Sequence, residues 1–112
     1  MTSRVRLLAV VFVAALAALL LWAPWNNRNP LDQGKQIYLT VSEPRCAICH
    51  TLRDAGAIGE VGPDLDALKP DQARVKTAVT NGIGVMPAFE ALTPAQIDAV
   101  SLYVSTVAGK KK

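Results

Sequence analysis

Two thiols and one imidazole lie close together near the middle of this chain of 112 residues. Cys46 and Cys49 are three positions apart, and His50 follows the second cysteine directly. Because one helical turn places residues at this spacing side by side, the two thiols can add to the two vinyl groups at one edge of a porphyrin. The imidazole that follows can then reach the iron. The motif therefore predicts covalent attachment of one haem c.

Three other chemistries use the same residue types, and each fits this chain less well. A structural zinc ion takes four ligands, whereas the chain has only two cysteines and one histidine. A redox-active dithiol normally begins a helix within a βαβ pattern, and no strand-like runs flank the motif. A dithiol or a plain disulfide remains the alternative to haem attachment.

The histidine and methionine content limits the second axial ligand of such an iron. His50 is the only histidine, and Met86 is the only methionine apart from the initiator. Residues 81–89 around Met86 contain two glycines and a proline, which indicate a loop rather than a packed helix face. A lone methionine usually fills a core, but an irregular backbone can aim a thioether. Met86 is therefore a candidate iron ligand.

The segments around these residues predict an all-α domain. A helix is expected from residue 30 to about residue 40, with an asparagine as its N-cap and a proline in first position. A second helix is expected over residues 70–81, with Gly82 as its left-handed end. Residues 93–96 read as a capping box, and the apolar residues that follow recur on one face of a terminal helix. Residues 53–60 are rich in glycine and alanine and indicate a loop.

The order of these motifs resembles that of small bacterial class I c-type cytochromes. The resemblance covers about residues 30–107 and rests on Cys-x-x-Cys-His, a Gly-Pro-x-Leu segment at 62–65, a Met-Pro-Ala-Phe loop at 86–89 and a closing helix that contains Tyr103. It implies a small cytochrome c fold, in which three to five helices wrap around one covalently bound haem. Before this domain, the uncharged N-terminal run predicts a hydrophobic helix.

The resemblance also implies roles for individual residues. His50 and Met86 would be the two axial ligands of the iron. The carbonyl oxygen of Pro63 would accept a hydrogen bond from the other ring nitrogen of His50, and Leu65 would pack on the haem. Gly34 would let the terminal helix cross the first helix closely.

Within this family, the chain resembles most closely the cytochrome subunits that accept electrons from periplasmic molybdenum sulfite dehydrogenases, and more loosely the cytochrome c6 and c551 shuttles. The resemblance implies redox proteins as donor and acceptor, with a molybdenum-containing dehydrogenase among them. The alternative is a haem enzyme or gas-binding protein with a labile sixth ligand. Such proteins usually use a distal base, and the only histidine is already expected to be a ligand, so electron transfer is favoured.

The N-terminus predicts export from the cytoplasm. Arg4 and Arg6 precede residues 7–23, a run of 17 residues without charge, and this order leaves the basic end in the cytoplasm. We expect residues 7–23 to anchor the protein in the bacterial inner membrane, with Trp22 and Trp25 at the interface and the domain on the periplasmic side. The alternative is cleavage as a signal peptide, which would release a soluble periplasmic protein.

Charge and length complete the expected organisation. Residues 1–28 form the anchor or signal segment, residues 29–109 the cytochrome c domain, and residues 110–112 a basic tail. The chain carries a net charge of +3, but residues 30–109 contain six basic and nine acidic residues, a net charge of −3, which argues against nucleic-acid binding. A domain of about 80 residues buries a small core, so the haem is expected to supply much of the surface on which the helices pack.

Overall fold

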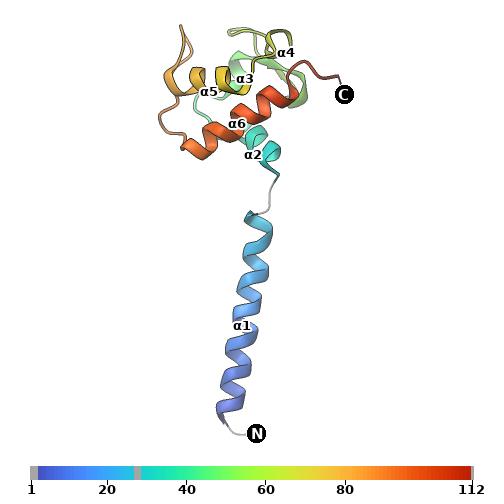
Figure 1. Cartoon of the computed structure of the whole chain (residues 1–112), viewed down its shortest axis with the longest axis vertical. Helices are drawn as coiled ribbons and strands as arrows, with labels where there is room; N and C mark the ends of the chain where they lie inside the picture. Colours follow the sequence, from blue (N-terminus) through green and yellow to red (C-terminus); the bar gives the residue numbers. More distant parts are fainter. Residues whose placement is uncertain (1–2, 27–28, 112) are drawn as a thin grey trace.

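The computed structural model describes residues 3–26 and 29–111, and side chains within residues 3–17 and 29–111. It is mostly helical, as the sequence predicts. The helices are α1 (Ser3–Asn26), α2 (Pro30–Gln36), α3 (Cys46–Cys49), α4 (Leu65–Leu68), α5 (Gln72–Asn81) and α6 (Pro94–Val107). Figure 1 shows α2 to α6 gathered into one domain, from which α1 stands apart.

The first helix of the domain begins as expected. The side chain of Asn29 accepts a hydrogen bond from the Leu31 amide at 3.0 Å, which satisfies a free donor of the first turn. After α2 the chain continues for one π-helical turn, η1 (Ile37–Val41), closed by a hydrogen bond from the Ser42 amide. The helical stretch therefore ends close to the predicted residue 40, although its last turn is wider than an α-helical one.

A close crossing of α2 and α6 forms the centre of the domain. A Cβ atom at Gly34 would overlap the carbonyl oxygen of Ala99 and the Cβ atom of Tyr103. Only glycine fits at this crossing, which confirms the role that the resemblance implies for Gly34. The main core contains Ile37, Tyr38, Leu52, Ala57, Leu65, Val100, Tyr103, Val104 and Ala108.

The last two long helices also start and stop where their sequences indicate. Asp71 caps α5 through a hydrogen bond from an amide of the first turn, so the helix begins slightly after the expected residue 70. Gly82 ends α5 with a φ angle of 71°, which favours glycine. At the start of α6, Thr93 accepts from the Gln96 amide at 3.2 Å, and the Gln96 side chain accepts from the Thr93 amide at 2.9 Å. The predicted capping box is confirmed.

The segment after the cysteine motif differs from the expected loop. Two short strands, β1 (Thr51–Leu52) and β2 (Ala57–Ile58), pair antiparallel across the 3₁₀ turn η2 (Arg53–Ala55). Gly56 closes this turn with a φ angle of 63°, and the paired Leu52 and Ala57 are both buried. The expectation of a loop without strands was wrong here, because each strand is two residues long and too short to show an alternating pattern.

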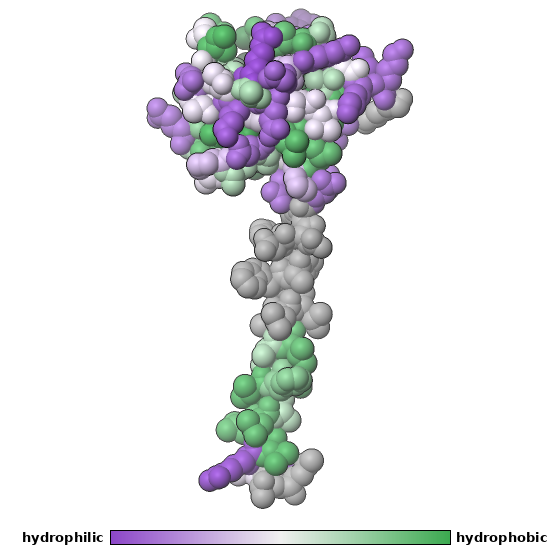
Figure 2. Space-filling model, in the orientation of Figure 1, coloured by the Kyte–Doolittle hydropathy of each residue, from purple (hydrophilic) through white to green (hydrophobic). Residues whose placement is uncertain are grey.

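The N-terminal segment forms α1, and the apolar side chains described along it are exposed. Figure 2 shows hydrophobic colour over this part of α1 and mostly hydrophilic colour on the visible face of the domain. Within the described residues, no helix reaches the length and apolarity that crossing a membrane requires. The predicted anchor over residues 7–23 is not supported by this finding, and the side chains of residues 18–23 lie outside the described part of the chain. Trp22 and Trp25 lie outside the described side chains.

Replacing Gly34 with alanine should destabilise the protein, because the added Cβ atom would meet backbone atoms of α6 that cannot rotate away. We expect the free energy of unfolding to fall by about 1–3 kcal/mol, the usual cost of overpacking. Guanidinium denaturation followed by circular dichroism measures this change. Gln36→Ala, an exposed change in the same helix, is the control and should stay within about 0.5 kcal/mol. Equal stability of Gly34→Ala and the wild type would contradict the close crossing.

Candidate functional site

The site begins at α3, the single helical turn that holds both thiols. The His50 amide donates to the Cys46 carbonyl oxygen at 3.0 Å, and the backbone of His50 is extended, so the chain leaves the turn at this residue. Cys46 and Cys49 are half-buried and do not form a disulfide with each other. One turn with both thiols unpaired suits attachment of the two sulfur atoms to one porphyrin edge.

The surroundings of the thiols disfavour the alternatives to haem attachment. Burial raises the pKa of the Cys46 thiol, and a contact of 3.4 Å with the Ser42 hydroxyl opposes this only in part. A redox-active dithiol requires the opposite, a lowered thiol pKa. In the part of the chain that the structure describes, no three His, Cys, Asp or Glu residues gather to hold a metal ion. A zinc site would therefore lack ligands.

The ring of His50 is held from two sides. Its Nδ1 atom lies 2.7 Å from the carbonyl oxygen of Pro63, and because a carbonyl can only accept, Nδ1 carries the proton and Nε2 is left with its lone pair. A Cβ atom at Gly62 would lie 2.5 Å from the Cε1 atom of the ring, so only glycine allows this approach. The Gly62 amide also donates to the Cys49 carbonyl oxygen at 2.7 Å. The imidazole thus has the tautomer and the fixed orientation of a metal ligand.

A buried tyrosine supports the same residue from the core. Tyr38 is 1% exposed, and its hydroxyl donates to the carbonyl oxygen of His50 at 3.0 Å. Its ring meets Tyr103 edge to face with centroids 6.1 Å apart. Burial raises the pKa of both tyrosines well above the usual range, so both hydroxyls remain donors. No sequence signal identifies the hydrogen-bond partner of Tyr38.

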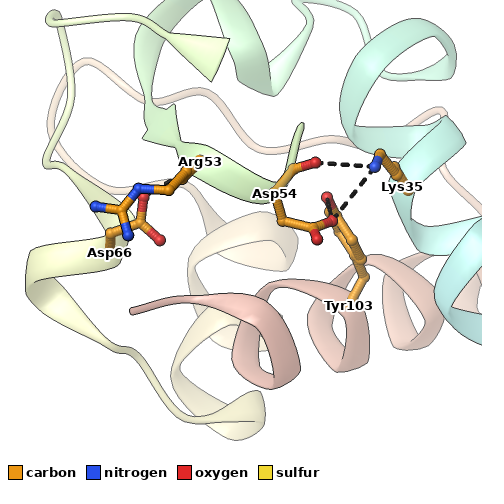
Figure 3. Close-up of polar contacts among 5 residues, drawn as sticks. All are labelled: Lys35, Arg53, Asp54, Asp66 and Tyr103. Atoms are coloured by element: carbon orange, nitrogen blue, oxygen red, sulfur yellow. Dashed lines mark hydrogen bonds and ion pairs between the residues drawn. The ribbon is translucent and has the colours of Figure 1, made fainter. Parts of the chain in front are cut away.

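Polar contacts hold the hairpin that follows His50. Figure 3 shows Asp54 between Tyr103 and Lys35, which come from α6 and α2. The Tyr103 hydroxyl donates to Asp54 Oδ2 at 2.7 Å, and Lys35 Nζ lies 2.8 Å from the Asp54 carbonyl oxygen and 3.4 Å from Oδ2. On the other side, Asp66 accepts from the amides of Arg53 at 2.7 Å and Gly109 at 2.9 Å. Sequence analysis missed Asp54 and Asp66, since both act through contacts distant in sequence.

Leu65 and Met86 lie in different apolar clusters. Leu65 belongs to the main core, against which Cys46 packs. Met86 is half-buried and packs against a second cluster, formed by Val79, Phe89 and Ile97. Two hydrogen bonds of 3.0 and 2.9 Å between Ile83 and Met86 close the turn that carries it. The structure therefore brings His50 and Pro63 into contact next to the turn that carries both cysteines, and holds Met86 on a separate loop closed by hydrogen bonds.

The residues present fit a porphyrin. The donor set combines two thiols on one turn with an imidazole whose Nε2 atom is free to bind iron, and the imidazole occupies a cradle that a Cβ at Gly62 would fill. Large apolar side chains are also more than half exposed on the segments that carry these groups: Ile48, Ile58, Val61, Ile83 and Val85. These side chains are available to cover an apolar group such as a porphyrin.

Comparison with known proteins identifies the class to which this site belongs. Residues 29–104 match the family described as cytochrome C oxidase, cbb3-type, subunit III. The chain is 34% identical over 84 residues to cytochrome c6 of Cyanidioschyzon merolae, a match that covers 71% of this chain and 77% of that protein. It is also similar to the crystal structure of the c-type cytochrome SorU from Sinorhizobium meliloti, with 68% identity, a TM-score of 0.71 and coverage of 72% of this chain and 93% of that one.

The fold and site therefore define a c-type cytochrome. The chain belongs to this family, and the predicted cytochrome c fold and the predicted resemblance to cytochrome c6 are confirmed. Family membership implies one covalently bound haem c, for which Cys46 and Cys49 provide the attachment motif. The assignment of His50 and Met86 as axial ligands remains a prediction.

Tyr38→Phe should disturb the haem environment, because it removes the donor to the His50 carbonyl oxygen. We expect the holoprotein to lose about 1–3 kcal/mol of unfolding free energy and the paramagnetically shifted haem methyl signals in the proton NMR spectrum of the ferric protein to move. Tyr103→Phe is the matched control, since it removes an equally buried hydroxyl that contacts Asp54 instead. It should lower stability while leaving the haem methyl signals nearly in place. Equal displacement of these signals in both variants would contradict a specific role of Tyr38.

Proposed function

We propose that this protein transfers single electrons in the bacterial periplasm and accepts them from a molybdenum-containing sulfite dehydrogenase. Its membership of the c-type cytochromes supports electron transfer. The observation that carries the proposal is the arrangement around His50, whose Nδ1 atom donates to Pro63 so that Nε2 can bind iron permanently. A periplasmic location is supported by Arg4 and Arg6, which precede an uncharged N-terminal run, and by the need to attach haem c outside the cytoplasm.

The residues of this chain would keep the haem six-coordinate in both charge states. When bound, haem c supplies a metal centre that gains and loses one electron. His50 would be one axial ligand and the thioether of Met86 the other, a pair that favours the reduced state relative to two nitrogen ligands. Leu65 would pack on the haem and limit access of water. Because Pro63 and Tyr38 hold His50 at two points, a change of charge need not move this ligand.

The choice of sulfite dehydrogenase as donor rests on resemblance. The sequence from residue 51 to residue 89 resembles that of cytochrome subunits which accept electrons from such enzymes. The chain also shares 68% identity with the c-type cytochrome SorU over most of its domain. Identity of this degree over most of the domain supports a common type of partner for the two proteins.

Met86→Ala tests the sixth ligand. The ferric variant should lose the near-infrared absorbance of iron bonded to sulfur, bind added imidazole readily and have a lower reduction potential, because a thioether favours ferrous iron. Val85→Ala is the matched control, since Val85 is 88% exposed in the same loop and should leave both properties unchanged. An unchanged spectrum and potential in Met86→Ala would show that Met86 is not the sixth ligand. If the sixth ligand of the wild type were then found to be labile, an enzyme or gas-binding function would be favoured.

The proposed donor can be tested with purified proteins. Oxidation of one sulfite with water gives one sulfate, two protons and two electrons, so a sulfite dehydrogenase should reduce two molecules of ferric cytochrome for each sulfite consumed. Visible absorbance follows the reduction, and a reaction without the enzyme is the control. If dithionite reduces the cytochrome but the enzyme with sulfite does not, the protein is still an electron carrier, and its donor is a different one.

A further inference from the structure

A groove of about 320 Å³ lies beside the loop that carries Met86. It runs between the end of η1 and the segment that connects the Met86 loop to α6. Its lining combines apolar and acidic side chains and includes Val41, Glu43, Phe89, Glu90, Leu92 and Gln96.

The floor of the groove is continuous with the surroundings of the proposed iron ligand. Phe89 is buried at 7% exposure and belongs to the same apolar cluster that Met86 and Leu92 pack against. The Phe89 amide donates to the Val79 carbonyl oxygen at 2.9 Å, which fixes the floor to α5. A molecule seated in the groove would therefore touch a side chain in the Met86 cluster.

The two glutamates at the groove have no structural role in the described part of the chain. Five of the nine carboxylates of residues 30–109 accept hydrogen bonds from amides or pair with a cation: Asp54, Asp64, Asp66, Asp71 and Asp98. Asp32 lies in the first turn of α2, where the helix dipole favours it. Glu43, Glu60 and Glu90 remain, all exposed and none with a hydrogen bond or ion pair among the described residues. Two of these three meet at one groove.

We propose that this groove receives a basic side chain of the redox partner, a lysine or arginine that projects from an apolar surface. The aliphatic part of such a side chain would lie on Val41 and Phe89, and its charge would approach the carboxylates of Glu43 and Glu90. The domain as a whole also attracts cations, with six basic and nine acidic residues. The inference rests on the proposed electron-transfer function and adds to it the chemistry of the docking partner.

The test compares two doubly neutralised holoproteins with the same net charge. Glu43→Gln/Glu90→Gln removes both charges at the groove, and Asp32→Asn/Glu60→Gln removes two exposed charges elsewhere. The reduced cytochrome gives one electron to tris(1,10-phenanthroline)cobalt(III), a cation with apolar faces, which becomes cobalt(II). We expect the groove variant to slow this reaction about tenfold at an ionic strength near 0.01 M, with the difference shrinking as salt screens the charges. The control variant should slow the same reaction less than about threefold, which is half of the tenfold effect on a logarithmic scale.

A second measurement does not depend on electron transfer. Hexaamminechromium(III) is a paramagnetic cation that does not exchange an electron with the protein, and it should broaden the amide signals of residues 41–43 and 88–92 in the wild type. The groove variant should lose this broadening, and the control variant should keep it.

Several outcomes would overturn the inference. Equal rates for the two variants, or broadening centred outside residues 41–43 and 88–92, would show that the groove is not the cationic docking site. A concentration-dependent dimer that only the groove variant loses would show that a second copy of this chain occupies the groove. If the proposed sulfite dehydrogenase fails to reduce the wild type while the cobalt complex still distinguishes the variants, the choice of donor falls and the groove assignment stands.

Discussion

The hydrogen bond between His50 Nδ1 and the Pro63 carbonyl oxygen constrains most of the domain. It forms only if residues 51–62 bring the chain back to the imidazole, and the return passes so close to the ring that Gly62 has no room for a Cβ atom. The hairpin after His50 supplies this return. Partners that orient a ligating histidine are commonly worth about 10–100-fold in metal affinity or activity, so the carbonyl oxygen of Pro63 is part of the site.

The aspartates and the glutamates of the domain differ in their contacts. The five that bind amides or pair with a cation are all aspartates, and all three glutamates are without such contacts in the described residues. An aspartate reaches nearby amides with few rotatable bonds, as Asp64 and Asp71 do at helix starts. A glutamate loses more rotamer entropy when it is fixed. The aspartates that stabilise the fold therefore hold their carboxylates close to the backbone, whereas the glutamates extend their carboxylates into solvent, where a partner can reach them.

Sequence patterns predicted what local rules determine, and missed contacts between distant segments. The capping box at Thr93 and the N-cap at Asn29 depend on residues within one turn, so their signals were sufficient. The hairpin after His50 was missed because strands of two residues show no periodicity. The hydrogen bond from Tyr38 and the meeting of Glu43 with Glu90 depend on how the chain folds back on itself. The resemblance implied the contact between His50 and Pro63, which spacing alone would not have shown.

The two proposed ligands are held in different ways, and both suit electron transfer. His50 is fixed by Pro63 and Tyr38, in contact with the main core. Met86 lies in a turn closed by two hydrogen bonds to Ile83, on a second cluster that includes Phe89. Met86 is half-buried although Ile83 and Val85 beside it are exposed, so a hydrogen-bonded turn and an apolar cluster hold it in place. Because Phe89 also lines the acidic groove, a partner docked there would contact the cluster of Met86 and not the residues that hold His50.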